Sequence, residues 1–418
     1  MFAKSLRSFH LSRKLYTRHY CLAAQEPSFN RIETQYVNNL KIVEGTEQIP
    51  IYRLLDVDGE LLNASEFPSI DKNLVQRFYK YMRTLKEVDK ILYECQRQGR
   101  ISFYMTGYGE EGVQIGSAAG LNDDDLVFPQ YRETGVLLWR GFTIDQCIDQ
   151  CFGNKKDAGK GKQMPIHYGS KDHHYVTVSS PLGTQLPQAV GAAYSYKMMK
   201  NKKCTIVYFG EGAASEGDAH AAFNFAATLQ CPIIFFCRNN GYAISTPATE
   251  QYRGDGIAGR GSAYGIAALK VDGNDVLGVY KATRIARNYA VENNSPIIVE
   301  AMTYRRGHHS TSDDSTAYRR QEEIDQWKKL DPIVRLQNFM EKYGMWDNEL
   351  QSKWVESIRK QILNSVVQSE KVKKPKWQEM FSDVYHDLPP HLQEQQQYME
   401  NHVKKYKQYY PLNDFEQS

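Results

Sequence analysis

The stretch Thr205–Asp218, "TIVYFGEGAASEGD", decides the fold of this 418-residue chain. Its apolar run is rich in Val, Ile and Phe and leads into the triplet Gly210-Glu211-Gly212. The segment Ser215–Leu229 follows with helical spacing of its apolar residues, and a second apolar run covers Pro232–Cys237. Strand, helix and strand within this length predict a βαβ unit, whose parallel strands are buried on both faces.

Other segments extend this prediction. Apolar residues at helical spacing over Leu74–Cys95 predict a long amphipathic helix. Short apolar runs at Leu126–Phe128 and at 295–304 predict further strands. Ser215 and Asp218 resemble the N-terminal cap of the central helix. The expected class is α/β, a mostly parallel sheet flanked by helices, with helical N- and C-terminal extensions.

We expect four parts along the chain. A leader covers 1–25, an N-terminal extension with the long helix covers 26–99, the sheet domain covers 100–365, and a polar, partner-facing extension covers 366–418. A solvated tail without a role is the alternative for this last part.

The leader accounts for the basic excess of the chain. Its 25 residues hold five Lys and Arg and no Asp or Glu, and apolar residues fall roughly on one helical face with serines between them. This composition is typical of a mitochondrial transit peptide, with a disordered basic tail as the alternative. Without the leader, 47 basic residues face 49 acidic ones, so the sequence does not favour nucleic-acid binding. No apolar run approaches the ~18 residues of a membrane helix, so no membrane function is expected.

The glycine-bracketed glutamate predicts a ligand site. Ligands of parallel α/β sheets bind beyond the carboxyl ends of the strands. Glu211 follows one strand, and Arg238-Asn239-Asn240 ends the next, so both face one crevice. Carboxylate and amide oxygens suit Mg²⁺, which commonly shares its coordination with phosphates. The glycines, the following helix N-terminus and Arg238 suit an anion, so a Mg²⁺–diphosphate site is predicted. The alternative is a surface turn beside an ordinary polar strand end.

These residues resemble a known motif. Thiamine-diphosphate enzymes carry Gly-Asp-Gly, about 26 further residues and Asn-Asn, and this chain has Gly210-Glu211-Gly212, then residues 213–238, then Asn239-Asn240. Glu replaces the usual Asp and still supplies an oxygen ligand. Over roughly residues 45–415 the chain is similar to alpha subunits of 2-oxo acid dehydrogenase complexes, through "FPQYRETG", "SSPLGTQLPQAVGAAY", "YRGDGIAGRG" and "MTYRRGHHSTSDDSTAYR".

Two details favour the branched-chain branch of this family over the pyruvate branch. They are the stretch from Glu211 to Gly217, "EGAASEG", and Gly307-His308-His309-Ser310. The resemblance implies a thiamine-diphosphate-binding fold over 100–365. It also implies oxidative decarboxylation of branched-chain 2-oxo acids from valine, leucine and isoleucine, with reductive acylation of lipoyl-lysine on an acyltransferase core. The same chemistry on pyruvate, and a non-catalytic scaffold subunit, are the alternatives.

The resemblance also implies partners and a compartment. The pyrimidine-binding domain of the cofactor site is expected on a separate beta subunit, in an assembly of two alpha and two beta chains. The compartment is the mitochondrial matrix, where a regulatory kinase and phosphatase act on the complex.

Residue roles come from the same resemblance. His309 is expected to act in acid–base catalysis, or only to bind phosphate, with His308 supporting its loop. Thiamine diphosphate would contact Tyr131, Arg132, Ser180, Leu182, Gly212, Ala213, Arg238 and His309. Mg²⁺ would be bound by Glu211, Asn240 and the carbonyl of Tyr242, and K⁺ by Ser179, Pro181, Thr184 and Gln185, where family branches differ. The substrate pocket would hold Gln130, Tyr131, Ser180 and Leu182.

One regulatory site is expected. Phosphorylation of Ser310 would place a dianion beside His309 and the diphosphate, and would block or disorder the loop. The family's second serine position is occupied here by Arg320.

Overall fold

The computed structural model describes residues 39, 40, 42 and 47–416. The predicted transit peptide at 1–25 therefore lies outside the described residues. From residue 47 onward the described residues belong to one unit.

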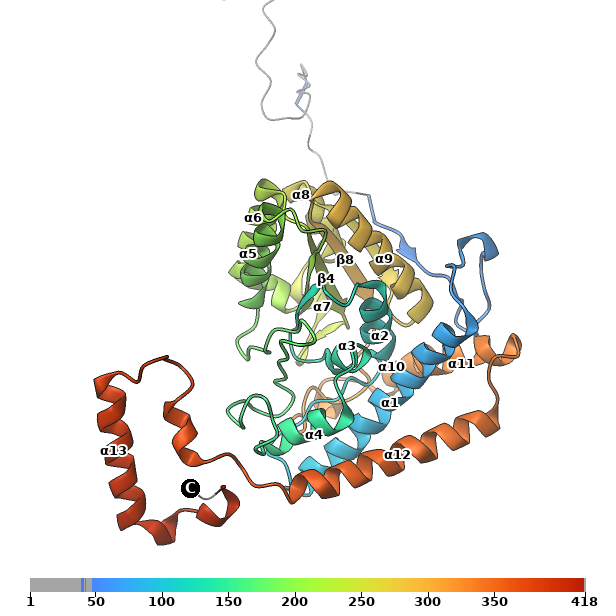
Figure 1. Ribbon diagram of the computed structural model, residues 1–418. Helices are drawn as coiled ribbons and strands as arrows, with labels where there is room; N and C mark the ends of the chain where they lie inside the picture. Colours follow the sequence, from blue (N-terminus) through green and yellow to red (C-terminus); the bar gives the residue numbers. More distant parts are fainter. Residues whose placement is uncertain (1–38, 41, 43–46, 417–418) are drawn as a thin grey trace, which may run out of the picture. The chain divides into compact units, whose positions relative to one another are not determined.

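A parallel sheet forms the centre of this unit (Figure 1). Within the described residues it has six strands in the order β1-β7-β8-β4-β3-β2, and every neighbouring pair is parallel. A separate antiparallel pair, β5 with β6, follows the end of β4. The strand bounds are β1 Ile51–Tyr52, β2 Leu126–Phe128, β3 Thr205–Gly210, β4 Ile233–Asn239, β5 Tyr242–Ala243, β6 Thr246–Pro247, β7 Ala267–Asp272 and β8 Ile297–Met302.

Helices cover both faces of the sheet. Figure 1 shows α5 and α6 on one side of β4 and β8, with α2 and α9 on the other. The helix bounds are α1 Lys72–Arg97, α2 Glu111–Gly120, α3 Thr134–Trp139, α4 Ile144–Phe152, α5 Gln185–Met198, α6 Gly217–Leu229, α7 Ala248–Gln251, α8 Gly261–Tyr264, α9 Val276–Asn293, α10 Gln321–Lys328, α11 Pro332–Lys342, α12 Asn348–Glu370 and α13 Pro390–Lys405.

The two-residue period of a strand explains why both faces need cover. In β3, Ile206 and Tyr208 belong to the core that includes α1, α2 and α9, whereas Val207 and Phe209 belong to the core that includes α5 and α6. Every residue from Thr205 to Phe209 is buried, because neighbouring side chains point to opposite faces that are both covered.

The predicted elements are confirmed with small shifts of their ends. The long helix is α1, and the carboxylate of Asp71 caps it by accepting from the Leu74 N–H at 2.8 Å. The strands expected at Leu126–Phe128 and within 295–304 are β2 and β8. The α/β class with a parallel sheet flanked by helices is likewise confirmed.

The expected cap of the central helix is wrong. Helix α6 begins at Gly217 after Glu216, and no side chain caps it. Ser215 lies too early because Ala213–Ser215 form a 3-10 turn, and its hydroxyl contacts Gln251 instead. The loop after β3 therefore keeps its backbone N–H groups free of side-chain caps, which suits an anion site.

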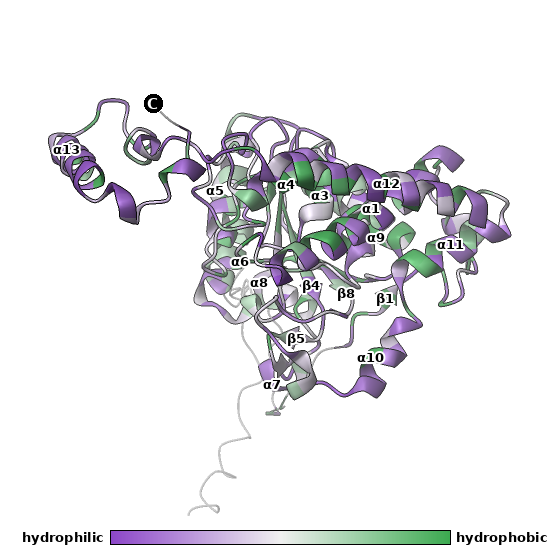
Figure 2. Ribbon diagram, turned by 90° about the horizontal axis from the view of Figure 1, so that it is seen from below, coloured by the Kyte–Doolittle hydropathy of each residue, from purple (hydrophilic) through white to green (hydrophobic). Residues whose placement is uncertain are grey.

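The predicted domain boundaries stay predictions. Helix α1 packs on α2, α3, α11 and α12, and α12 continues through residue 365 without a break. Beyond α12 the chain is mostly polar, and α13 is largely hydrophilic (Figure 2). Backbone bonds of Lys374 with Asp414 and Glu416 join the two ends of this extension. Within the described residues no helix combines the length and the apolar character that a bilayer span requires.

Candidate functional site

A cavity of about 490 Å³ opens at the carboxyl ends of β3 and β4. Gly210 pairs with Arg238 in the sheet register, so the residues that follow each strand lie side by side. The cavity gathers all the predicted cofactor and magnesium residues from distant parts of the chain. They are Tyr131, Arg132, Ser180, Leu182, Glu211, Gly212, Ala213, Arg238, Asn240, Tyr242 and His309.

Glu211 lines this cavity, and only one of its carboxylate oxygens is hydrogen-bonded among the described residues. Its Oε2 accepts from the Asn240 N–H at 3.2 Å, whereas its Oε1 has no hydrogen-bond partner among the described residues. Burial raises the pKa of Glu211 to about 7, and the nearby carboxylate of Glu110 adds to the effect. A buried carboxylate without a counter-charge is costly, and a bound cation would remove that cost.

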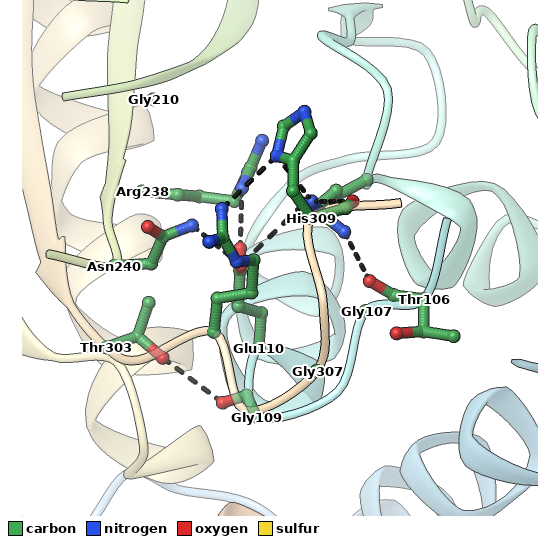
Figure 3. A network of polar contacts seen from close by, with 12 residues as sticks. Thr106, Gly107, Gly109, Glu110, Gly210, Arg238, Asn240, Thr303, Gly307 and His309 are labelled. Atoms are coloured by element: carbon green, nitrogen blue, oxygen red, sulfur yellow. Dashed lines mark hydrogen bonds and ion pairs between the residues drawn. The ribbon is translucent and has the colours of Figure 1, made fainter. Parts of the chain in front are cut away.

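Arg238 lies between two buried glutamates. Its Nη1 donates to Glu110 Oε2 at 2.5 Å, and Glu110 Oε1 accepts from Asn240 Nδ2 at 2.9 Å (Figure 3). The Nε of Arg238 donates to Glu133 Oε1 at 2.5 Å. Burial alone would lower the pKa of Arg238, but the two carboxylates hold it above its ordinary value. Its Nη2 is buried without a partner among the described residues and remains free for an anion.

Replacing Arg238 with methionine should destabilise the folded chain. Glu110 and Glu133 are both fully buried, and the change would leave them without this cation. We expect the free energy of unfolding to fall by about 3–5 kcal/mol, the usual cost of removing one partner from a buried ion pair. Denaturant unfolding checks this. As a control, R284M removes an arginine whose contact with Asn122 is solvent-exposed, and it should change the stability by less than about 1 kcal/mol. A loss of similar size in both variants would contradict the prediction.

His309 is held by two arginines. Its Nδ1 lies 3.3 Å from Arg132 Nη2 and 3.2 Å from Arg305 Nη1, and Arg132 also donates to the His309 carbonyl at 2.6 Å. Guanidinium groups can only donate, so Nδ1 accepts and the proton of the neutral ring is on Nε2. Burial, with the positive charges of Arg132 and Arg305, lowers the pKa of His309 to about 3. His309 therefore offers a neutral N–H donor at neutral pH.

Hydrogen bonds within the loop hold the backbone around His309. The His309 N–H donates to Asp313 Oδ2 at 2.7 Å, and the same oxygen accepts from the Tyr318 hydroxyl at 2.6 Å. His308 contacts the Ser315 hydroxyl at 2.9 Å, in keeping with a supporting role. Ser310 is partly exposed beside this network, and its carbonyl accepts from the Asp313 N–H at 3.1 Å.

The predicted potassium residues lie outside the lining of the cavity. The Thr184 hydroxyl contacts Ser179 Oγ at 3.4 Å and the Pro181 carbonyl at 3.2 Å, so three of the four gather in one turn. Gln185 is buried and donates to the Tyr208 carbonyl at 3.0 Å. Gln130, expected in the substrate pocket, is also buried and accepts from the Gly210 N–H at 2.6 Å.

The sequence motifs did not reveal the residues that hold Arg238 and His309 in place. Glu110 and Glu133 hold Arg238, and Arg305 holds His309. Glu133 and Arg305 stand inside the stretches "FPQYRETG" and "MTYRRGHHSTSDDSTAYR", so their position was a usable signal. Glu110 lies before α2, far along the chain from Arg238, and its sequence gives no comparable signal. The Thr106 carbonyl, which accepts from Arg132 Nη1 at 2.5 Å, belongs to the same support.

The donor set fits a magnesium diphosphate. No cluster of three His, Cys, Asp or Glu side chains that could hold a metal occurs in the described part of the chain. A cation here would therefore take one carboxylate, amide or carbonyl oxygens, and oxygens of a bound phosphate, which is a common arrangement for Mg²⁺. Glu211 and Arg238 both line this cavity, and their unpartnered atoms, Glu211 Oε1 and Arg238 Nη2, match the cation and the anion respectively.

Sequence comparison places the chain in a family that matches this geometry. The model of the dehydrogenase E1 component family matches residues 79–378, so the chain belongs to that family. Membership implies dependence on thiamine diphosphate.

The relatives are named alike. Over 417 residues the chain is 52% identical to the mitochondrial 2-oxoisovalerate dehydrogenase subunit alpha of Bos taurus, covering 99% of this chain and 92% of the relative. It is 54% identical over 394 residues to the Homo sapiens subunit of the same name, covering 94% and 88%. For the Dictyostelium discoideum subunit the identity is 53% over 386 residues, covering 92% and 88%. These names support the branched-chain interpretation over the pyruvate one.

Proposed function

We propose that this chain is the alpha subunit of a mitochondrial thiamine-diphosphate-dependent dehydrogenase. Its complex would oxidatively decarboxylate branched-chain 2-oxo acids such as 3-methyl-2-oxobutanoate and pass the acyl group to lipoyl-lysine on an acyltransferase core. The names of the relatives support the substrate class and the compartment. The observation that carries the chemistry is that two buried atoms without a partner among the described residues, Glu211 Oε1 and Arg238 Nη2, belong to residues that line one cavity at the sheet edge.

The chain would hold the diphosphate end of the cofactor. Glu211, Asn240 and the Tyr242 carbonyl would bind Mg²⁺, and Arg132 and Arg238 would neutralise the diphosphate. Thiamine diphosphate, when bound, supplies the carbanion and the electron sink that decarboxylation requires. The chain's own part is to orient that group and to offer the Nε2–H of His309 as a donor to charge that develops on the substrate.

Three further roles belong to this proposal. A beta subunit would complete the cavity, since Ser180 and Leu182 at its wall are exposed in the chain by itself. The turn with Ser179, Pro181 and Thr184 would bind K⁺ together with Gln185. A kinase would modify Ser310 and a phosphatase would reverse it.

The test is turnover by the chain co-expressed with its beta partner. We expect release of carbon dioxide from 3-methyl-2-oxobutanoate that requires both thiamine diphosphate and Mg²⁺, with kcat/KM above that for pyruvate. A preference for pyruvate would contradict the substrate class. A folded heterotetramer without turnover on either acid would contradict the proposed catalytic function.

A further inference from the structure

His167 lines the cofactor cavity together with Ser180. It is buried and follows Ile166, whose φ of 65° is in the left-handed region. A β-branched residue rarely adopts this conformation, and such strain is concentrated at functional sites. The strained turn is fixed on both sides, because the Met164 carbonyl accepts from Gln150 Nε2 and the Tyr168 carbonyl from the Val178 N–H.

Hydrogen bonds define the tautomer of His167. Its Nδ1 lies 3.1 Å from the Pro165 carbonyl oxygen, which can only accept, so Nδ1 carries the proton. Its Nε2 lies 2.7 Å from Ser180 Oγ and therefore accepts the proton of that hydroxyl. The lone pairs of Ser180 Oγ remain for a group in the cavity, which Ser180 also lines.

His309 and His167 present opposite groups to the same cavity. Two guanidinium donors occupy Nδ1 of His309, so this ring offers an N–H and cannot readily take up a proton. His167 carries its proton on the side away from Ser180, so its basic nitrogen is directed to the serine. The cavity thus contains one histidine that donates and one that accepts.

His167 also borders a second cavity of about 620 Å³, and among the described residues it alone lines both. The charged and titratable groups that line the two cavities with His167 are Tyr131, Arg132, Glu211, Glu216, Arg238, Tyr242, Arg305 and His309 on one side, and Asp157, Lys171, Asp172, His174 and Tyr175 on the other.

We propose that Ser180 and His167 form a proton-accepting dyad for the acyl-transfer step, in which Ser180 contacts the substrate oxygen and His167 is the positioning residue behind it. This inference rests on the proposed function. The reacting carbon is oxidised by the lipoyl disulfide, whose S–S bond breaks as a C–S bond forms. Meanwhile the hydroxyl O–H bond on that carbon breaks, its electron pair forms the C=O bond, and the bond from that carbon to the cofactor breaks and returns its electron pair to the cofactor. The second lipoyl sulfur leaves as a thiolate, which takes a proton from solvent. The proton moves to Ser180 Oγ, and the serine's own proton moves to His167 Nε2 and then to solvent.

The test uses the heterotetramer with His167→Gln. Glutamine can accept a hydrogen bond from Ser180 but cannot take its proton. We expect acylation of a lipoyl domain, followed by mass spectrometry, to slow about 10²-fold or more, as for loss of a general base. Release of carbon dioxide in the first turnover should stay within about threefold, and so should the calorimetric Kd for thiamine diphosphate with Mg²⁺. The double variant with Ser180→Ala should be no slower in acylation than the slower single variant.

A matched control exists in the neighbouring loop. His173 contacts the Ser170 hydroxyl at 2.7 Å but does not line the cofactor cavity, so His173→Gln should acylate at the parental rate. Parental acylation by His167→Gln, or equal slowing of carbon dioxide release and acylation, would overturn the dyad. An inactive parent heterotetramer would instead overturn the proposed function.

Discussion

Replacing Glu211 with glutamine should abolish cofactor-dependent turnover and leave the fold at least as stable as before. The free Oε1 would no longer carry charge for a cation. We expect the affinity for Mg²⁺ with thiamine diphosphate to fall by at least about 10²-fold, more than the effect of removing an outer-shell partner. Calorimetric titration of the heterotetramer and the carbon dioxide assay measure the two losses.

Glu211→Gln should raise the free energy of unfolding at high pH and leave it unchanged at low pH. The pKa of Glu211 in the folded chain is about 7, above its ordinary value of 4.5 because of burial. The folded state therefore favours the protonated form, and the cost of ionisation grows as pH rises from about 4.5 to about 7. At pH 8, in the absence of metal, glutamine should stabilise the fold by about 2 kcal/mol or less, and at pH 4 the effect should vanish. Thermal unfolding in a chelator at both pH values checks this.

The matched control is Glu292→Gln on the exposed side of α9. It should bind cofactor and turn over like the parent. Undiminished Mg²⁺ affinity in Glu211→Gln would exclude this carboxylate as a ligand, and a destabilised Glu211→Gln at pH 8 would contradict the cost assigned to its burial.

Ser310→Glu should inactivate the heterotetramer by about 10³-fold, in the range expected when a preorganised donor is lost. The new carboxylate would lie in the same turn as Asp313, which accepts from the His309 N–H and from Tyr318. Repulsion between the two carboxylates would displace Asp313, free the His309 backbone and place negative charge where the diphosphate is expected.

Ser312→Glu is the control for this change. Ser312 is exposed two residues further on, and its side chain makes none of the bonds that hold His309. It should keep most of the activity, and limited proteolysis should cleave the loop faster only in Ser310→Glu. Full activity of Ser310→Glu would contradict a regulatory role for this serine.

The sheet and the core of the site could be predicted because their signals are local. The apolar runs of β3 and β4 and the helical spacing between them define the βαβ unit, so the positions of Glu211 and Asn240 at one edge follow from strand order. The same local pattern misplaced the cap of α6, because Ala213–Ser215 form a 3-10 turn and the helix begins only at Gly217.

The supporting residues could not be predicted for the opposite reason. Glu110 contacts Arg238 across 128 residues of chain, and His167, which contacts Ser180, follows Ile166 with its φ in the left-handed region. Neither fact leaves a periodic or compositional trace in the sequence. The protonation pattern of His309, which depends on Arg132 and Arg305 meeting at one nitrogen, also belongs to the tertiary structure.

The most direct test of the central claim is a crystal structure of the heterotetramer with thiamine diphosphate and Mn²⁺ in place of Mg²⁺. Anomalous scattering would locate the metal without reference to the protein. We predict a single strong peak per alpha chain at bonding distance from Glu211 Oε1, Asn240 Oδ1, the Tyr242 carbonyl and the diphosphate, with Arg238 Nη2 on a phosphate oxygen. A peak elsewhere, or a diphosphate bound without Glu211 and Arg238, would contradict the account.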